Sequence, residues 1–142
     1  MSLFRPKIPI KVMHRNRNKR SHIKRGGDLT IGEYGLKMLT PCEINEYQLE
    51  ACRKAMQGKV KRMGKIVCRP FPNRAKGSKP VESRMGKGAA TPDHWYYFAP
   101  KGVIIWEITG VNRELAISAL KLAQVRLPGV SKIVCAKNQY TT

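Results

Sequence analysis

The sequence predicts an α+β fold in which two helices are combined with several short strands. Two segments carry apolar residues at helical spacing, one in the first half of the chain and one near its end. Short runs rich in β-branched and aromatic residues lie around them, as is typical of strands. With 142 residues and 42% hydrophobic composition, the chain is long enough to bury one core.

The first half of the chain is expected to form a strand followed by a helix. Apolar residues recur between positions 28 and 39 as in a strand, and Pro41 ends this run. Asn45 is a favourable N-cap, and Gln48 completes a capping box. The helix is expected to extend to Gly64. Its apolar stripe consists of Leu49, Cys52, Met56, Val60 and Met63.

A long basic loop is expected in the middle of the chain. Residues 66–71 favour a strand that Pro72 ends, whereas residues 73–93 show no apolar period. The strongest local feature of this loop is Arg84-Met85-Gly86-Lys87-Gly88. Glycines let a backbone approach a surface closely, and flanking cations can contact phosphates. Taken alone the motif is weak, because a solvated loop without a ligand could have the same composition.

The last third of the chain is expected to form a hairpin, a helix and a final strand. The apolar runs 94–98 and 103–108 flank residues 99–102, whose proline and glycine suit a type I turn. The hairpin aromatics are interpreted as core or sheet surface rather than as a base-stacking platform. A helix is predicted over 112–127 and a strand over 132–137. The apolar face of the helix consists of Leu115, Ala119, Leu120, Ala123 and Leu127.

Positive charge is concentrated in two parts of the chain. Lysine and arginine number 28 against 9 acidic residues, which gives a net charge of +19. Residues 1–27 carry nine basic and no acidic residues, and residues 53–87 carry twelve basic residues and one acidic residue. A localised excess of this kind indicates a polyanionic partner. We therefore divide the chain into a basic N-terminal extension, 1–27, and one domain, 28–142.

The sequence lacks the patterns of a metal site, a membrane span and a secretory signal. The four cysteines form no Cys-x-x-Cys pair, and the histidines complete no zinc-ligand spacing, so no metal or cofactor is predicted. The thiols are interpreted as reduced and mostly buried, as in an intracellular protein. No apolar run approaches the roughly 18 residues of a membrane span, and the opening residues lack the features of a secretory signal.

Catalytic signals are weak. Gly58 and Gly64-Lys65 resemble a phosphate loop, but five residues separate the glycines instead of four and Ile66 replaces the hydroxyl residue. Asp93 and His94 are adjacent, yet no nucleophile signature accompanies them. No catalytic residue is therefore predicted, and the chain is not expected to be an enzyme.

Short motifs that cover nearly the whole chain carry a family resemblance. They are MHRNR (13–17), GEYGLK (32–37), QLEACRKAM (48–56), RMGKI (62–66), FP (71–72), KP (79–80), RMGKG (84–88), Trp95 and GV (110–111). In order and spacing they resemble the large-subunit ribosomal protein sixteen family of bacteria and organelles. The resemblance implies two helices packed on an antiparallel, barrel-like sheet. It also implies a structural role that involves ribosomal RNA, neighbouring ribosomal proteins and no membrane.

The resemblance further implies where the RNA lies. Members of the family bind large-subunit ribosomal RNA near the central protuberance and the aminoacyl-tRNA site, through the basic arm and the loop, and the loop approaches tRNA. This chain departs from the family at Ala89-Ala90, where Lys-Gly is usual, and at Asn16, where glycine is common. The cysteines are unusual for a bacterial member. They indicate an organellar ribosome, for which a mitochondrial location is predicted, with plastid and bacterial cytoplasm as alternatives.

The leading hypothesis is a ribosomal protein that stabilises folded RNA by neutralising closely spaced phosphates. An RNA-binding assembly factor and an RNA-processing enzyme are the alternatives. The predicted RNA-binding residues are His14, Arg15, Arg17, Lys19, Arg20, Arg25, Arg53, Lys54, Lys61, Arg62, Lys65, Arg84, Gly86, Lys87 and Gly88.

Overall fold

Seven strands and two helices form the part of the chain that the computed structural model describes, namely residues 23, 26–86, 88 and 90–136. In chain order the elements are β1 (Tyr34–Met38), β2 (Cys42–Asn45), α1 (Glu46–Val60), β3 (Lys65–Cys68), β4 (Arg74–Ser78), β5 (Thr91–Ala99), β6 (Ile104–Thr109), α2 (Arg113–Gln124) and β7 (Ser131–Cys135). The predicted α+β class is confirmed.

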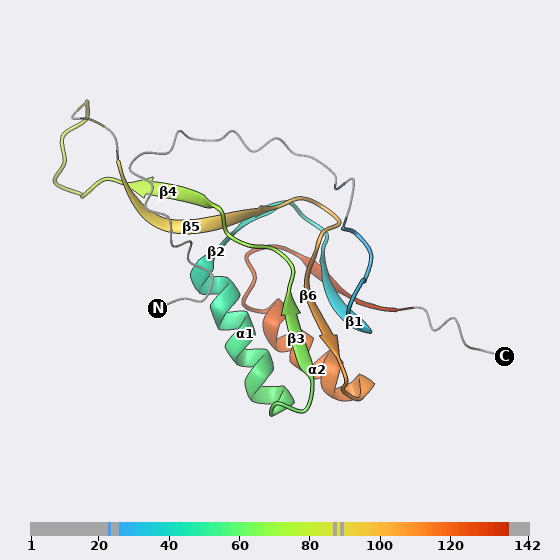
Figure 1. Cartoon of the computed structure of the whole chain (residues 1–142). Coiled ribbons are helices and arrows are strands. Elements are labelled where there is room, and N and C mark those ends of the chain that lie inside the picture. The colour runs from blue at the N-terminus through green and yellow to red at the C-terminus, as the bar shows by residue number, and fades with distance from the viewer. Residues whose placement is uncertain (1–22, 24–25, 87, 89, 137–142) are drawn as a thin grey trace.

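The strands form two antiparallel sheets (Figure 1). One has four strands in the order β3-β6-β1-β7, and the other has three in the order β2-β5-β4. At the centre of the larger sheet, Leu36 of β1 lies opposite Trp106 of β6 and Ile133 of β7. The barrel-like sheet implied by the resemblance is wrong, because β3 and β7 remain separate edges of an open sheet.

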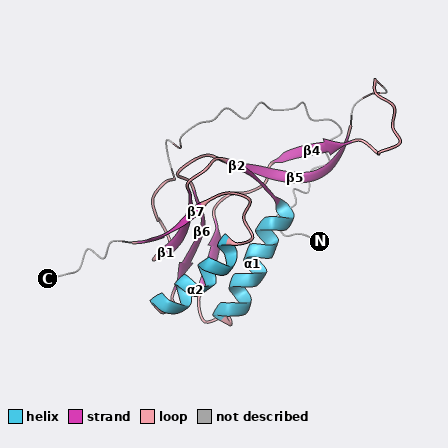
Figure 2. Ribbon diagram, turned by 180° about the vertical axis from the view of Figure 1, so that it is seen from behind, coloured by secondary structure: helices cyan, strands magenta, loops and turns pink. Residues whose placement is uncertain are grey.

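Both helices cover the same face of the four-stranded sheet, and they pack against each other (Figure 2). The capping box at the start of α1 is confirmed, since the Asn45 backbone N–H donates to Gln48 Oε1 at 2.9 Å. The apolar stripe of α1 is buried except at Met63, which is 65% exposed. That part of the prediction is wrong because α1 ends at Val60. The core between helices and sheet includes Leu36, Leu49, Cys52, Met56, Ile105, Trp106, Ile108, Ala119, Leu120 and Ala123.

The predicted hairpin is wrong, because β5 and β6 belong to different sheets. Strand β5 pairs with β2 and β4, whereas β6 pairs with β1 and β3. Two hydrogen bonds explain the divergence. The Gly102 N–H donates to the Met38 carbonyl, and the Met38 N–H donates to the Val103 carbonyl, both at 2.8 Å. The residues that follow β5 are thereby hydrogen-bonded to the end of β1, and the next strand, β6, pairs with β1.

Two strands lie where none was predicted. Strand β2 occupies the four residues before α1 and pairs with β5. Strand β4 falls inside the predicted irregular segment 73–93, where Arg74 lies opposite Tyr96 and Lys76 opposite His94. Its residues have little strand propensity of their own, so the strand depends on the ladder that β5 offers. The basic loop is therefore shorter than expected and begins after Ser78.

The predicted ends of the other elements shift by a few residues. Helix α2 ends at Gln124 rather than near Leu127, although Leu127 is buried as expected. All four cysteines are free, but of these Cys52 is buried while Cys135 is exposed. The prediction of mostly buried thiols is thus wrong for Cys135. Burial raises the pKa of Cys42 to about 11 and that of Cys52 to about 12, so neither thiol is reactive at neutral pH.

Two further findings concern the described residues only. None of their helices is long and apolar enough to cross a membrane. They contain no group of three or more His, Cys, Asp or Glu side chains placed to hold a metal ion. The division between residues 1–27 and 28–142 stays a prediction, because most of the extension lies outside the described part of the chain.

Candidate nucleic-acid interface

The structure describes eight of the fifteen predicted RNA-binding residues, and they fall into two groups. One group extends from the middle of α1 to the start of β3, and the other lies in the loop between β4 and β5. The remaining seven lie outside the described residues: His14, Arg15, Arg17, Lys19, Arg20, Arg25 and Lys87.

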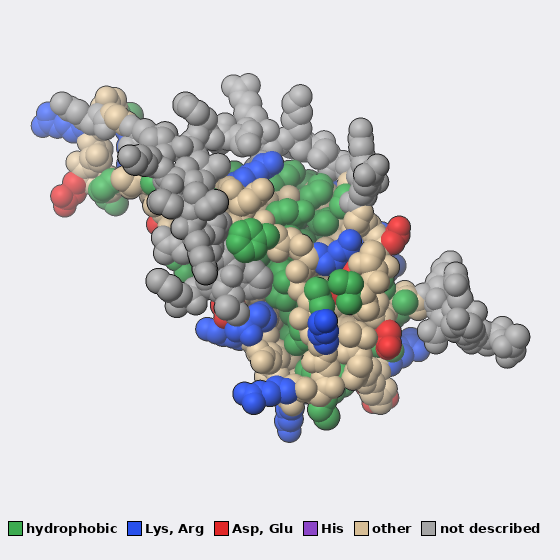
Figure 3. All heavy atoms as spheres, viewed as in Figure 1, with side chains coloured by type: hydrophobic (Ala, Val, Ile, Leu, Met, Phe, Trp, Pro, Cys, Tyr) green, Lys and Arg blue, Asp and Glu red, His purple; other side chains and the backbone are tan. Residues whose placement is uncertain are grey.

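Five exposed cations surround the end of α1, and we refer to them as the basic end of α1. They are Lys54, Lys59, Lys61, Arg62 and Lys65. Figure 3 shows Lys and Arg side chains gathered at this lower end of the molecule. The apolar stripe of α1 faces the core, so Lys54 and Lys59 project from its other sides, whereas Lys61 and Arg62 lie in the turn after α1 and Lys65 begins β3. Lys59 was not predicted, although its place in the basic segment and off the apolar stripe could have indicated it.

Arg53 differs from its neighbours because its guanidinium is engaged within the helix. Its Nε and Nη2 donate to the two carboxylate oxygens of Glu50 at 3.1 and 2.7 Å, and its Nη1 donates to Gln57 Oε1 at 2.6 Å. The hydrogen bond from Arg53 lowers the pKa of Glu50. Lys54 lies 3.9 Å from the same carboxylate. Arg53 therefore has fewer N–H groups free for a ligand than the other predicted residues.

The remaining cations of the basic end have no such partner. Among the described residues, no acidic side chain lies within ion-pair distance of Lys59, Lys61, Arg62 or Lys65. Cations are also favoured near a helix C-terminus, where the backbone carbonyls carry partial negative charge. These exposed side chains are thus free to meet an anion.

A surface hollow of about 250 Å³ separates the end of α1 from β3. It is lined by Arg53, Gln57, Val60, Arg62, Gly64 and Ile66. A second, more open hollow lies beside it, and Arg62 lines both. The combination of a cationic rim and a small apolar floor suits a phosphate-bearing ligand. Among the described residues that line the two hollows, there is no nucleophile next to a general base.

The loop between β4 and β5 forms the second basic group. It projects from the three-stranded sheet, at the opposite end of the molecule from the basic end of α1 (Figures 1 and 2). Arg84 is exposed, and Gly86 and Gly88 have φ angles of +78° and +75°. Apart from the two chain neighbours, no atom of the described residues lies within 4 Å of where a Cβ would stand at either glycine. Backbone conformation, rather than packing, therefore favours glycine there.

Comparison with known proteins shows the family to which the chain belongs. The family model described as "Ribosomal protein L16p/L10e" matches residues 6–134. The chain belongs to this family. A curated relative is the "Large ribosomal subunit protein uL16c" of Cyanidium caldarium, which is 41% identical over 122 residues, or 86% of each chain. The resemblance inferred from the short motifs is therefore confirmed.

Membership of the L16p/L10e family bears on several predictions. The family is one of ribosomal proteins, which are structural components rather than enzymes. The matched region includes the basic end of α1, the loop and most of the basic arm. The relative is of the chloroplast type, which supports an organellar origin but not specifically a mitochondrial one. Which residues contact RNA stays a prediction.

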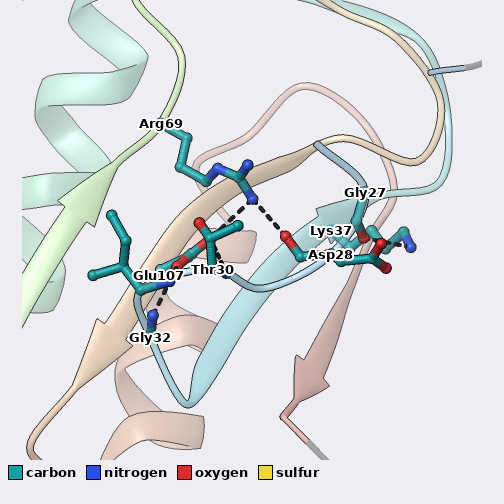
Figure 4. A network of polar contacts seen from close by, with 8 residues as sticks. Gly27, Asp28, Thr30, Gly32, Lys37, Arg69 and Glu107 are labelled. Carbon is teal, nitrogen blue, oxygen red and sulfur yellow. Dashed lines mark hydrogen bonds and ion pairs between the residues drawn. The ribbon is translucent and has the colours of Figure 1, made fainter. Parts of the chain in front are cut away.

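One polar network of this L16p/L10e protein was missed from the sequence (Figure 4). The Glu107 side chain is fully buried and accepts hydrogen bonds from the backbone N–H groups of Ile31 and Gly32, both at 2.8 Å. Arg69 Nη1 donates to Glu107 Oε1 at 2.9 Å and to the Asp28 carbonyl at 2.7 Å. The network connects residues 28–32, which follow the basic arm in sequence, to strand β6. An acid inside an apolar strand was the signal that could have predicted it.

Proposed function

We propose that this protein is a structural component of the large ribosomal subunit that binds and stabilises folded ribosomal RNA near the aminoacyl-tRNA site and the central protuberance. The observation that supports this most directly is the basic end of α1. Four of its five cations have no acidic partner among the described residues, so their charge is available to phosphates. The family and the name of the relative support the ribosomal setting.

The proposed mechanism is electrostatic. Folding brings RNA phosphates close together, and their mutual repulsion opposes the compact state. Lysine and arginine side chains that neutralise these phosphates release bound counterions and stabilise the fold of the RNA. Such contacts position the protein and carry little sequence information. A structured RNA presents both its phosphates and its shape to a surface of this kind.

The two described basic groups contact different parts of the RNA in this proposal, because they lie at opposite ends of the molecule. The basic arm is proposed to insert into ribosomal RNA. The loop that carries Arg84 is proposed to contact RNA and to approach tRNA. Neighbouring ribosomal proteins are proposed as further partners of this chain.

The proposed location is an organellar ribosome. The chloroplast-type relative supports a plastid as one possibility, and the mitochondrial assignment stays a prediction. A bacterial ribosome is the remaining alternative.

Whether the protein is a component of the mature large subunit is tested by quantitative mass spectrometry across a sucrose gradient of salt-washed native extract. One copy per large subunit in the mature peak is the expected result. Signal confined to precursor particles would favour the assembly-factor alternative, and would contradict a component of the mature subunit. Turnover of RNA by the purified protein would instead favour an RNA-processing enzyme.

A further inference from the structure

The chain makes an unusual turn directly after α1. Lys61 and Arg62 have φ angles of +48° and +65°. The Met63 N–H donates to the Val60 carbonyl at 3.0 Å and so closes a turn with these two residues at its centre. Positive φ at both central positions is the pattern of a type I′ turn. Among the described residues, these are the only non-glycine positions with positive φ.

Residue types other than lysine and arginine are favoured in such a turn. Type I′ turns prefer Asn-Gly, because asparagine and glycine adopt the left-handed conformation most easily. A helix that ends in this conformation usually has glycine at that position. A side chain with a Cβ destabilises the left-handed backbone, so Lys61 and Arg62 each reduce the stability of the turn.

The fold offers no compensation through these two side chains. Both are exposed, and neither has an acidic partner among the described residues. The turn itself is held by the backbone, since the Lys61 N–H donates to the Gln57 carbonyl at 3.0 Å. Next to it, a Cβ at Gly64 would lie 2.7 Å from the Thr109 carbonyl oxygen, so the chain is packed closely on the end of β6. The two cations therefore project from a fixed position.

We propose that Lys61 and Arg62 form a fixed phosphate-binding turn, in which side chains that reduce fold stability are used to contact RNA. The inference rests on the proposed function and deepens it by naming the part of the interface where binding and stability oppose each other. Its ligand is the phosphodiester backbone of folded RNA. Arg62 can donate two parallel hydrogen bonds to one phosphate, and Lys61 acts as a point charge beside it.

The test is the double variant K61N/R62G, which places the favoured Asn-Gly pair in the turn. We expect the melting temperature to rise by about 2–4 °C, the shift that roughly 1 kcal/mol produces in a chain of this size. Affinity for purified large-subunit ribosomal RNA is expected to fall about tenfold or more at ~0.1 M salt, with a shallower salt dependence. A purely structural role would move stability and binding in the same direction.

A matched control separates the turn from net charge. The variant K121A/K132A removes two exposed lysines, from α2 and from β7 at the opposite edge of the larger sheet. It carries the same net charge as K61N/R62G and is expected to bind RNA with a smaller decrease in affinity. An equal decrease in both variants would overturn the inference, because total charge rather than the turn would then explain the effect.

The remaining outcomes distinguish this inference from the proposed function. Wild-type affinity in K61N/R62G, or a lower melting temperature, would overturn the role of the turn while the proposed function stands. Failure of the wild-type protein to bind large-subunit ribosomal RNA in a salt-dependent manner would overturn both.

Discussion

Glu107 shows how one buried residue can link strand β6 to the segment that follows the basic arm in sequence. A buried carboxylate is tolerated only when hydrogen bonds and a counter-charge replace its hydration. Backbone N–H groups of residues 30–32 and the guanidinium of Arg69 supply both. Residues 28–32 follow the basic arm in sequence, so these contacts hold the segment to which the arm is joined.

Replacement of Glu107 by glutamine tests this link. The amide keeps the size of the side chain but removes the charge opposite Arg69, whose side chain is 22% exposed. We expect the free energy of unfolding to fall by about 3 kcal/mol, as for other buried ion pairs from which one partner is removed. Urea denaturation measures the change. The control E82Q, at an exposed loop position, is expected to shift stability by less than about 0.5 kcal/mol. Equal effects in the two variants would contradict the assigned role.

The same carboxylate makes stability depend on pH. Burial raises the pKa of Glu107, but the backbone N–H donors and Arg69 outweigh it, so the net pKa is lower than usual. The stabilisation is therefore fully present above the unfolded-state pKa of about 4.3 and is lost as pH falls through the folded value. The stability difference between wild type and E107Q is expected to be constant from pH 7 to pH 5.5. It should shrink at pH 4 and below, and a difference that grows in acid would refute the ionised state.

At the scale of elements, the connection from α1 to β3 positions the basic end of α1. Two glycines in this region have different roles. Gly58 lies within α1 and, apart from its chain neighbours and the backbone of its own helix, no atom of the described residues lies within 4 Å of where its Cβ would stand. At Gly64, the same atom would lie 2.5 Å from Val111 Cγ1 and 2.7 Å from the Thr109 carbonyl oxygen. Close packing of the turn on β6 thus requires glycine at Gly64 but not at Gly58.

Alanine substitutions at these glycines should have opposite effects on stability. G64A is expected to destabilise the fold by about 1–3 kcal/mol, because the neighbouring backbone must move. G58A is expected to stabilise it by about 0.5–1 kcal/mol through the higher helix propensity of alanine. Thermal unfolding of both variants checks the pair. A stabilising G64A would show that the turn is not packed as described.

The loop between β4 and β5 is an element whose role should lie in binding rather than folding. We expect R84A/K87A to weaken RNA binding, with the slope of log affinity against log salt reduced by about 0.7–0.9 for each phosphate that is no longer neutralised. Arg84 is exposed and belongs to no apolar face, so the melting temperature should not change. The control S83A, from the same loop, removes no charge and should bind as wild type. A lower melting temperature in R84A/K87A would contradict a role limited to binding.

For the whole molecule, the distribution of charge is consistent with the proposal that this small protein contacts RNA in several places. The net charge of +19 is concentrated in the arm and in the segment 53–87, while the remainder is nearly neutral. The fold then places the loop and the basic end of α1 at opposite ends. In the proposed function, contacts at these separated sites are joined through one folded chain, so they would stabilise the relative positions of RNA segments.

Removal of residues 1–20 tests the contribution of the arm. The truncation deletes seven basic residues but keeps Ile23, whose N–H donates to the Lys101 carbonyl at 3.1 Å. We expect the salt dependence of RNA binding to become shallower by about 0.9 or 0.7 for each phosphate that the arm neutralises in the full chain. The melting temperature should stay close to that of the full chain. An unchanged salt dependence would show that the arm neutralises no phosphates.

Features that depend on local sequence could be predicted. The α1 cap at Asn45 and its buried stripe follow from capping chemistry and helical period, and both are confirmed up to the end of the helix at Val60. Among the candidate site residues, Lys54, Lys61, Arg62 and Lys65 gather at one end of α1 because the helix and its turn bring neighbours in sequence together. The engagement of Arg53 by Glu50 and Gln57 was not foreseen, although the three residues share one helix face.

The sequence by itself determined the α+β class, the helices, the family and the presence of a basic surface, because these follow from local periodicity, composition and motif order. Only the tertiary structure decided how the strands pair, since β4 pairs with the edge of β5, and β6 pairs with β1 rather than with β5. It also decided the partner of Glu107 and the left-handed turn at Lys61 and Arg62. These features depend on residues far apart in sequence, or on a backbone conformation that opposes local preference, and neither is visible in local patterns.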